Sequence, residues 1–150
     1  MVGIGGDNIS TFYSEKSEEV RKNQNPLDIT IVERVKKVLG KKGIVLHQSV
    51  DADRHLIADG KEATTYSDGT IIMHTNVSAS AFYEELIHYG QVKSGRAVVG
   101  DAENYYLMEI EAQERLIKYQ NAYRITDYEI EILTGNLEFY KIQLAELRKG

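Results

Sequence analysis

Two adjacent glutamates and a histidine are the residues of this sequence best suited to chemistry. Glu84, Glu85 and His88 lie within residues 78–91, a segment whose apolar residues recur with the period of a helix. At about 100° per residue, Glu84 and His88 share one face, while Phe82 lies on the opposite side and can anchor the helix to a core. Two ligands at positions i and i+4, with a glutamate between them as general base, form the pattern by which a helix binds zinc.

The surroundings of this segment resemble a compact zincin metallopeptidase. Residues 70–75 read as a hairpin strand before the motif helix, and a later helix carries the letters E-I-E-A at residues 109–112. This order is similar to that of the ImmA/IrrE type, whose H-E-x-x-H helix is followed by a helix with E-x-E-A. The likeness covers about residues 43–122, and Glu84 stands where that motif has its first histidine.

The resemblance implies a role for each residue of the motif. His88 would be the retained imidazole ligand, Glu84 would take the position of the first ligand, and Glu85 would be the base that deprotonates metal-bound water. Two carboxylates with one imidazole make a harder ligand set than two imidazoles with one carboxylate, so we expect zinc first, with manganese or iron(II) as alternatives. The extra negative charge also weakens the metal as a Lewis acid, which makes the protein either a divergent hydrolase or an inactive relative.

The resemblance also implies a third ligand from the following helix, which is predicted over residues 103–122. Glu109 lies on the apolar stripe of that helix, whereas Glu111 lies on the side with charged residues. A carboxylate on a buried face is unfavourable unless it is paired or bound to a metal. We therefore predict that Glu109 is the ligand and that Glu111 remains in solvent near Arg115, where its removal has almost no effect.

The remaining histidines offer further candidates. His74 ends the strand just before the motif helix and can approach the site from the side, so it joins Glu85 as a candidate catalytic residue that contacts substrate or an oxygen of the transition state. His47 and His55 lie near the acidic residues of 51–53 and favour a different interpretation, a metal-free nuclease toxin that uses acid–base catalysis. In a third interpretation, the motif residues are simply the solvated face of an amphipathic helix.

The pattern of elements predicts an α+β fold, in which a small antiparallel sheet of three to four strands packs against the motif helix and several C-terminal helices. Two Asp-Gly pairs flanked by short apolar runs predict hairpin turns. Thr30 and Thr126 each precede a glutamate by three residues, which is the spacing of a capping box. The predicted strands cover residues 44–48, 55–58, 63–67 and 70–75, and the predicted helices cover residues 30–40, 81–93, 103–122, 126–135 and 137–148.

The length of 150 residues suits one zincin-like domain over residues 28–150. Residues 1–27 are polar and rich in glycine and asparagine, which predicts a flexible arm or linker with a short helix around residues 14–22. Such an opening also suits a module of a larger parent protein, and it lacks the basic start and apolar stretch of a signal peptide. The absence of cysteine excludes disulfides and thiolate metal sites but leaves the compartment open.

The net charge of −5 argues against a nucleic-acid partner, and no apolar run approaches the roughly 20 residues of a membrane span. The sequence therefore predicts a metal-dependent hydrolase, most readily a divergent peptidase that acts on a protein or peptide. The resemblance and the linker-like opening suggest an effector module of a phage or toxin-type protein with an immunity-type partner. The alternatives are an inactive zincin-like interaction or structural module and the metal-free nuclease toxin.

Overall fold

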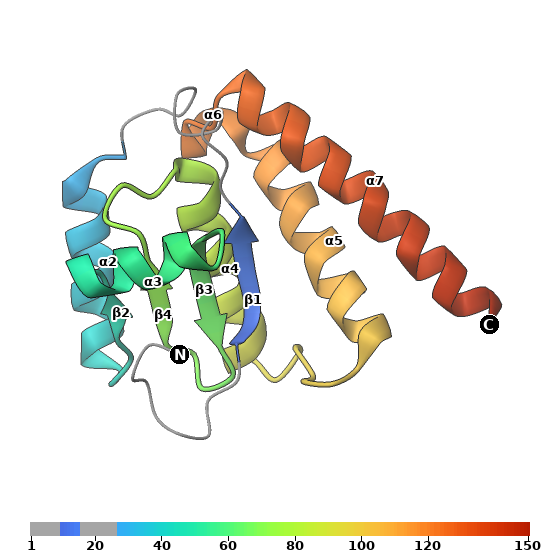
Figure 1. Cartoon of the computed structure of the whole chain (residues 1–150), viewed down its shortest axis with the longest axis horizontal. Coiled ribbons are helices and arrows are strands. Elements are labelled where there is room, and N and C mark those ends of the chain that lie inside the picture. The colour runs from blue at the N-terminus through green and yellow to red at the C-terminus, as the bar shows by residue number, and fades with distance from the viewer. Residues whose placement is uncertain (1–9, 16–26) are drawn as a thin grey trace.

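The computed structural model describes residues 10–15 and 27–150, and in these residues it has an α+β fold of four strands and six helices (Figure 1). The predicted α+β class is confirmed. The strands are β1 (Ser10–Glu15), β2 (Leu46–His47), β3 (Lys61–Tyr66) and β4 (Ile71–Met73). The helices are α2 (Ile29–Lys41), α3 (Val50–Ala58), α4 (Ala79–Lys93), α5 (Ala102–Lys118), α6 (Gln120–Tyr123) and α7 (Asp127–Lys149).

The strands form one sheet in the order β1-β3-β4-β2. β1 pairs antiparallel with β3, and β3 pairs antiparallel with β4 through the predicted turn, where Gly69 has a φ of 92° that glycine adopts without strain. β2 pairs parallel with β4, so the prediction of antiparallel pairing is wrong for this strand. The long connection through α3 and β3 supplies the length of chain that a parallel pair needs.

Strand β1 lies within residues 1–27, which were predicted to be a flexible arm, so that prediction is wrong for residues 10–15. Phe12 is buried at 1% exposure and Tyr13 is 40% exposed, an alternation that is typical of a strand with one covered face. The predicted helix over residues 14–22 is wrong at residues 14 and 15, which belong to β1, and its other residues lie outside the described part of the chain. The alternation is too short to indicate a strand when the residues around it in the sequence are polar and rich in glycine.

Residues 55–58, predicted as a strand, are the last turn of α3. The helix begins at Ser49, whose Oγ accepts a hydrogen bond of 3.0 Å from the amide of Ala52. Ala52 and Leu56 lie four residues apart and are both buried against the sheet. Gly60, the glycine of the first Asp-Gly pair, has a φ of 69° and follows the end of the helix, so this pair forms no hairpin.

Helices cover both faces of the sheet (Figure 1). Ile71 and Met73 of β4 pack with α2 and α4, and Phe82 of α4 belongs to the same core cluster. Ile72, between the two, packs instead against α3. The alternating side chains of β4 therefore divide the core into two parts, and the apolar side of α4 packs in one of them.

The C-terminal helices lie beside this layer, and α7 runs along α5 (Figure 1). The helix predicted over residues 103–122 ends at Lys118 and is followed by the short α6. The two helices predicted over residues 126–135 and 137–148 are one helix, α7. Glycine inside a helix is unfavourable by only about 1 kcal/mol relative to alanine, and the buried Leu133 and Leu137 on either side of Gly135 outweigh that effect.

The capping box predicted at Thr126 is confirmed. Its hydroxyl accepts a hydrogen bond of 3.2 Å from the amide of Glu129, and the Glu129 carboxylate accepts one of 2.9 Å from the amide of Thr126. The box predicted at Thr30 is wrong, because Asp28 caps α2 and accepts from the Thr30 amide at 2.9 Å. Among the described residues, no helix is both long and apolar enough to cross a membrane.

Candidate metal centre

Helix α4 carries the three residues of the sequence motif, and all three are buried. Ser78 caps the helix, and Phe82 fixes its apolar side in the core. This orientation turns Glu84 and His88 toward α5, and His88 has no exposed surface at all. The interpretation of the motif as solvated surface is therefore wrong.

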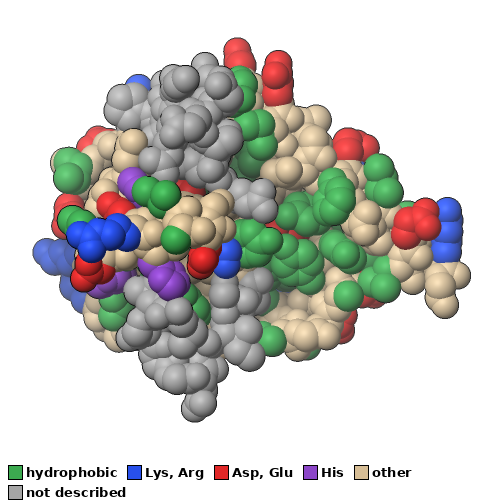
Figure 2. Space-filling model, viewed as in Figure 1, with side chains coloured by type: hydrophobic (Ala, Val, Ile, Leu, Met, Phe, Trp, Pro, Cys, Tyr) green, Lys and Arg blue, Asp and Glu red, His purple; other side chains and the backbone are tan. Residues whose placement is uncertain are grey.

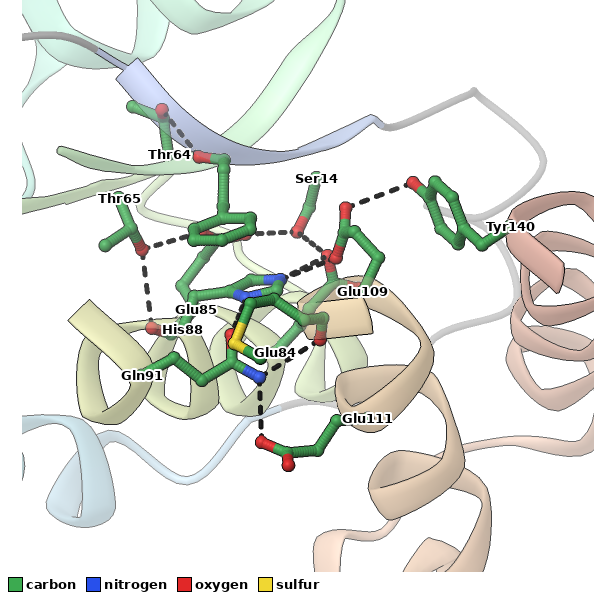
Figure 3. Close-up of polar contacts among 12 residues, drawn as sticks. Ser14, Thr64, Thr65, Glu84, Glu85, His88, Gln91, Glu109, Glu111 and Tyr140 are labelled. Atoms are coloured by element: carbon green, nitrogen blue, oxygen red, sulfur yellow. Dashed lines mark hydrogen bonds and ion pairs between the residues drawn. The ribbon is translucent and has the colours of Figure 1, made fainter. Parts of the chain in front are cut away.

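Glu84, His88 and Glu109 form a compact group of possible metal ligands (Figure 3). One ligand atom from each residue lies within 4.8 Å of the others. His88 Nε2 lies 2.7 Å from Glu109 Oε1 and 3.8 Å from Glu84 Oε2. The structure thus brings together the three residues that were predicted as ligands, and their binding of a metal stays a prediction.

Two atoms of this group are buried without a hydrogen bond. His88 Nε2 and Glu109 Oε1 are close enough to form an ion pair, but they are not aligned as a hydrogen bond, and neither has another hydrogen-bond partner. Buried polar atoms without such a partner are unfavourable and uncommon. A cation bound by both atoms would satisfy them, and imidazole nitrogen with carboxylate oxygen is a suitable donor set for zinc, manganese or iron(II). The residues present therefore fit a divalent metal.

The protonation of the group also indicates a cation site. Burial opposes a charge on His88, but Glu109, Glu84 and Glu85 outweigh this effect and hold the pKa of His88 well above its ordinary value. Burial raises the pKa of Glu84. The carboxyl groups beside His88 thus favour a positive charge at this point of the interior, and a divalent cation would supply one.

The side chain of Gln91 fixes the ring orientation of His88 (Figure 3). The Gln91 amide nitrogen donates to the carbonyl of Met108 at 3.0 Å and to Glu111 Oε1 at 2.9 Å, and both partners can only accept. The amide oxygen must therefore face His88 Nδ1, at 2.7 Å, and Nδ1 must donate to it. In the neutral imidazole, this leaves the lone pair on Nε2, the nitrogen that faces the two carboxylates.

Glu111 is not in the ligand group, but the prediction that it only meets solvent is wrong. It forms an ion pair with Arg96 through both carboxylate oxygens and also accepts the hydrogen bond from Gln91. The hydrogen bond from Arg96 lowers the pKa of Glu111, which keeps the carboxylate charged. Glu111 therefore supports His88 through Gln91.

Glu85, the predicted base, lies beside the group and is fully buried. Its two oxygens accept hydrogen bonds of 2.7 Å each, one from Thr65 and one from Ser14. The Ser14 hydroxyl also lies 3.3 Å from Glu84 Oε2, so it links the two carboxylates. Burial raises the pKa of Glu85 to about 7, and a proton acceptor with a pKa near neutrality suits general base catalysis.

Aromatic residues enclose the group on two sides. The ring of Phe12 from β1 stacks on His88 with 3.8 Å between ring centroids. The hydroxyls of Tyr105 and Tyr140 donate to Glu109 Oε2 at 3.3 and 3.1 Å. The sequence analysis identified neither these tyrosines nor β1 as neighbours of the group, because nothing local in the sequence shows which distant residues meet His88.

The other predicted histidines are occupied elsewhere. His74 Nδ1 accepts a hydrogen bond from the amide of Asn76 at 2.9 Å, and His74 Nε2 lies 3.9 Å from a carboxylate oxygen of Asp53. These contacts direct its ring toward Asp53, and it is not a member of the ligand group. His47 contacts Ser49 and His55 contacts Asp59, so the two histidines of the nuclease hypothesis have separate partners.

A cavity of about 560 Å³ opens beside the ligand group, between β1, α4, α5 and α7. Ser14 and Glu84 are among its lining residues. The group is therefore buried from most directions but adjoins a space large enough for part of a substrate. Glu84 is thus the member of the ligand group that faces this space.

Comparisons with known proteins gave no relative. No protein-family model matches the chain, and no curated protein or solved structure matches it. A function for this protein must therefore be argued from the geometry of the centre itself.

Proposed function

We propose that the protein is a metal-dependent hydrolase that cleaves peptide bonds. The observation that carries this proposal is the pair of buried atoms without a hydrogen bond, His88 Nε2 and Glu109 Oε1, with Glu84 beside them. The resemblance of the E-E-L-I-H helix and the following E-x-E-A helix to zincin peptidases supports the same function. The adjoining cavity and the position of Glu85 supply the other parts that hydrolysis requires.

Glu84, His88 and Glu109 would hold the metal, with zinc the first candidate and manganese or iron(II) the alternatives. A bound divalent ion would polarise the scissile carbonyl and acidify a water molecule. Glu85 would accept the proton of that water on a carboxylate oxygen, since each oxygen keeps a lone pair beside its hydrogen bond. Tyr105 and Tyr140 would hold Glu109 in place through their hydroxyls.

An inactive metal-binding scaffold is the second candidate, and one observation favours it. Both oxygens of Glu85 are held by hydroxyl groups and the side chain has no exposed surface, which also suits a purely structural role. The nuclease hypothesis has less support, because His47 and His55 do not share partners. An effector module of a phage or toxin-type protein remains the biological setting that the resemblance suggests.

Metal retention tests the centre. The protein, dialysed separately against zinc, manganese and iron(II), should retain about one ion per chain by elemental analysis, because three ligands are already in place. His88→Ala and Glu109→Gln should abolish retention, and Glu84→His should tighten zinc binding by restoring the usual pair of imidazoles. Glu114→Gln, at an exposed position of α5, is the control. No retention of any of the three metals would overturn the proposal.

Activity separates the hydrolase from the scaffold. The metal-loaded protein should cleave unfolded casein, and Glu85→Gln should retain the metal while losing the cleavage, because only the proton acceptor is removed. Loss of both metal and cleavage in this variant would give Glu85 a structural role. Metal retention without cleavage by the unaltered protein would favour the inactive scaffold.

A further inference from the structure

The cavity beside the metal centre has an acidic lining. Glu62, Glu84 and Glu129 contribute carboxylates to it, and its described lining residues include no lysine, arginine or histidine. The partners of Glu129 are neutral donors: its oxygens accept from the hydroxyl of Ser80 and from the amide and hydroxyl of Thr126. Glu129 therefore offers to a ligand in this space a carboxylate whose described hydrogen-bond partners are all neutral, and an anionic ligand would be repelled there.

A separate observation points to a ligand with N–H groups. Gln113 lines the same cavity, is 1% exposed, and its Oε1 has no hydrogen-bond partner. Gln113 also counteracts the rise in the pKa of Glu84, as an amide N–H group beside a carboxyl group does, and Oε1 is the atom of this amide that has no partner. A buried acceptor without a partner is unfavourable, and a donor group on the ligand would satisfy it.

The walls of the cavity are aromatic. Tyr105, Tyr106 and Tyr140 line it together with Phe139, and Figure 2 shows hydrophobic side chains gathered over α5 and α7 beside β1, with acidic side chains among them. Aromatic faces attract organic cations through their π electrons. A carboxylate, an unpaired acceptor and aromatic faces together favour a ligand group that is positively charged and donates hydrogen bonds.

We propose that this cavity binds a protonated amino group of a peptide, either a lysine side chain or the amino terminus. As a substrate subsite this inference rests on the proposed peptidase function, because the amine would place a neighbouring peptide bond near Glu84. Binding of the amine itself requires no metal. The two proposals can therefore be tested apart.

The test uses the full chain without metal and n-butylamine as the probe, followed by NMR of the tyrosine rings. We expect saturable binding of n-butylamine that weakens with added sodium chloride, and no binding of the neutral n-butanol. Gln113→Leu should weaken binding about tenfold, because a hydrogen bond to a charged group is lost. Tyr106→Leu tests the aromatic wall in a second variant, and Ile142→Ala, on an exposed part of α7 outside the lining, is the control.

Equal binding of n-butylamine and n-butanol would overturn the inference, as would unchanged affinity in both cavity variants. Peptides that contain one lysine, with or without an acetylated amino terminus, then distinguish the two sources of the amine. Replacement of that lysine by norleucine should abolish binding if the side chain is recognised, and acetylation should abolish it if the amino terminus is recognised. If the amine does not bind but the protein retains metal normally, only the amine site is contradicted. If the amine binds but no metal is retained, only the metal centre is contradicted.

Discussion

At the scale of single residues, the centre depends on what holds His88 in one orientation. Its Nδ1 is fixed by Gln91, and Gln91 is fixed in turn by Glu111 and the carbonyl of Met108. In metal sites, the partner on the second ring nitrogen sets the tautomer and direction of the imidazole. The chain from Arg96 through Glu111 and Gln91 is therefore expected to tune metal binding without touching the metal.

This gives a prediction that differs from the one based on sequence alone. Gln91→Leu should lower metal affinity about 10–100-fold, and Glu111→Ala should lower it about tenfold, since Gln91 then keeps only its bond to Met108. Titration against a competing chelator would measure both affinities. Glu114→Ala, at an exposed position on the same helix, should leave the affinity unchanged. An unchanged affinity in Glu111→Ala would mean that the Met108 carbonyl alone orients Gln91.

Spacing along helices was sufficient to predict which residues meet, but not what surrounds them. Glu84 and His88 are one turn apart, and Glu109 lies on the apolar stripe of its helix, so a helical wheel could select all three. Gln113 lies one turn beyond Glu109 and was within reach of the same reasoning. Ser14 could not be found in this way, because its contact with Glu85 joins residues 71 positions apart in the sequence.

At the scale of elements, the edge strand β1 completes the centre. It pairs with β3 and places Phe12 against the His88 ring and Ser14 against the two glutamates of α4. This strand is short and lies in a polar segment, so it was not predicted from the sequence. Its role depends on long-range pairing, which local patterns do not encode.

Phe12→Ala tests this contribution of β1. Phe12 is 1% exposed, and removal of a buried phenylalanine ring should lower the free energy of unfolding by about 3–5 kcal/mol. Tyr13→Ala, on the exposed side of the same strand, should lower it by less than about 1 kcal/mol. Urea unfolding followed by circular dichroism would measure both. Similar losses in the two variants would mean that Phe12 contributes no more than an exposed residue of the strand.

The elements that were misassigned share a physical cause. Residues 55–58 were predicted as a strand from their residue types. Burial of Ala52 and Leu56 on one helical face and the N-cap at Ser49 stabilise a helix there instead. Gly135 looked like a break between two helices, whereas packing of α7 along α5 continues across it. In both cases tertiary burial outweighed local preference. The long periodic helices, by contrast, were predicted with the correct type.

At the scale of the whole molecule, the centre joins segments that are distant in sequence. α4 and α5 supply the candidate ligands, β1 covers His88, and Tyr140 of α7 donates to Glu109. Metal binding should therefore stabilise the fold as a unit and not one helix alone. The raised pKa values of Glu84 and His88 favour their protonated forms, so protons are expected to compete with a metal for these two side chains.

The direction of this competition follows from the pKa shifts. A group whose pKa is raised in the fold adds stability that is complete below its unfolded pKa and is lost as the pH rises through the folded pKa. For Glu85, whose pKa is raised from 4.5 to about 7, the loss falls between these two values. For His88, whose pKa is held well above 6.5, the loss begins near 6.5 and continues above it. The contribution of these groups to metal-free stability therefore falls as the pH rises.

We accordingly expect the stabilisation by zinc to increase between about pH 5 and about pH 8, as the protons leave the ligands. At a fixed free zinc concentration about one hundred times the Kd at pH 8, binding adds about 2.7 kcal/mol at that pH, or about 5–10 °C in Tm for a chain of this size. Scanning calorimetry with and without zinc at four pH values would measure the increase, and His88→Ala should show no zinc shift at any of them. A zinc shift of equal size throughout would contradict the competition, because the ligand atoms would then be free of protons even without the metal.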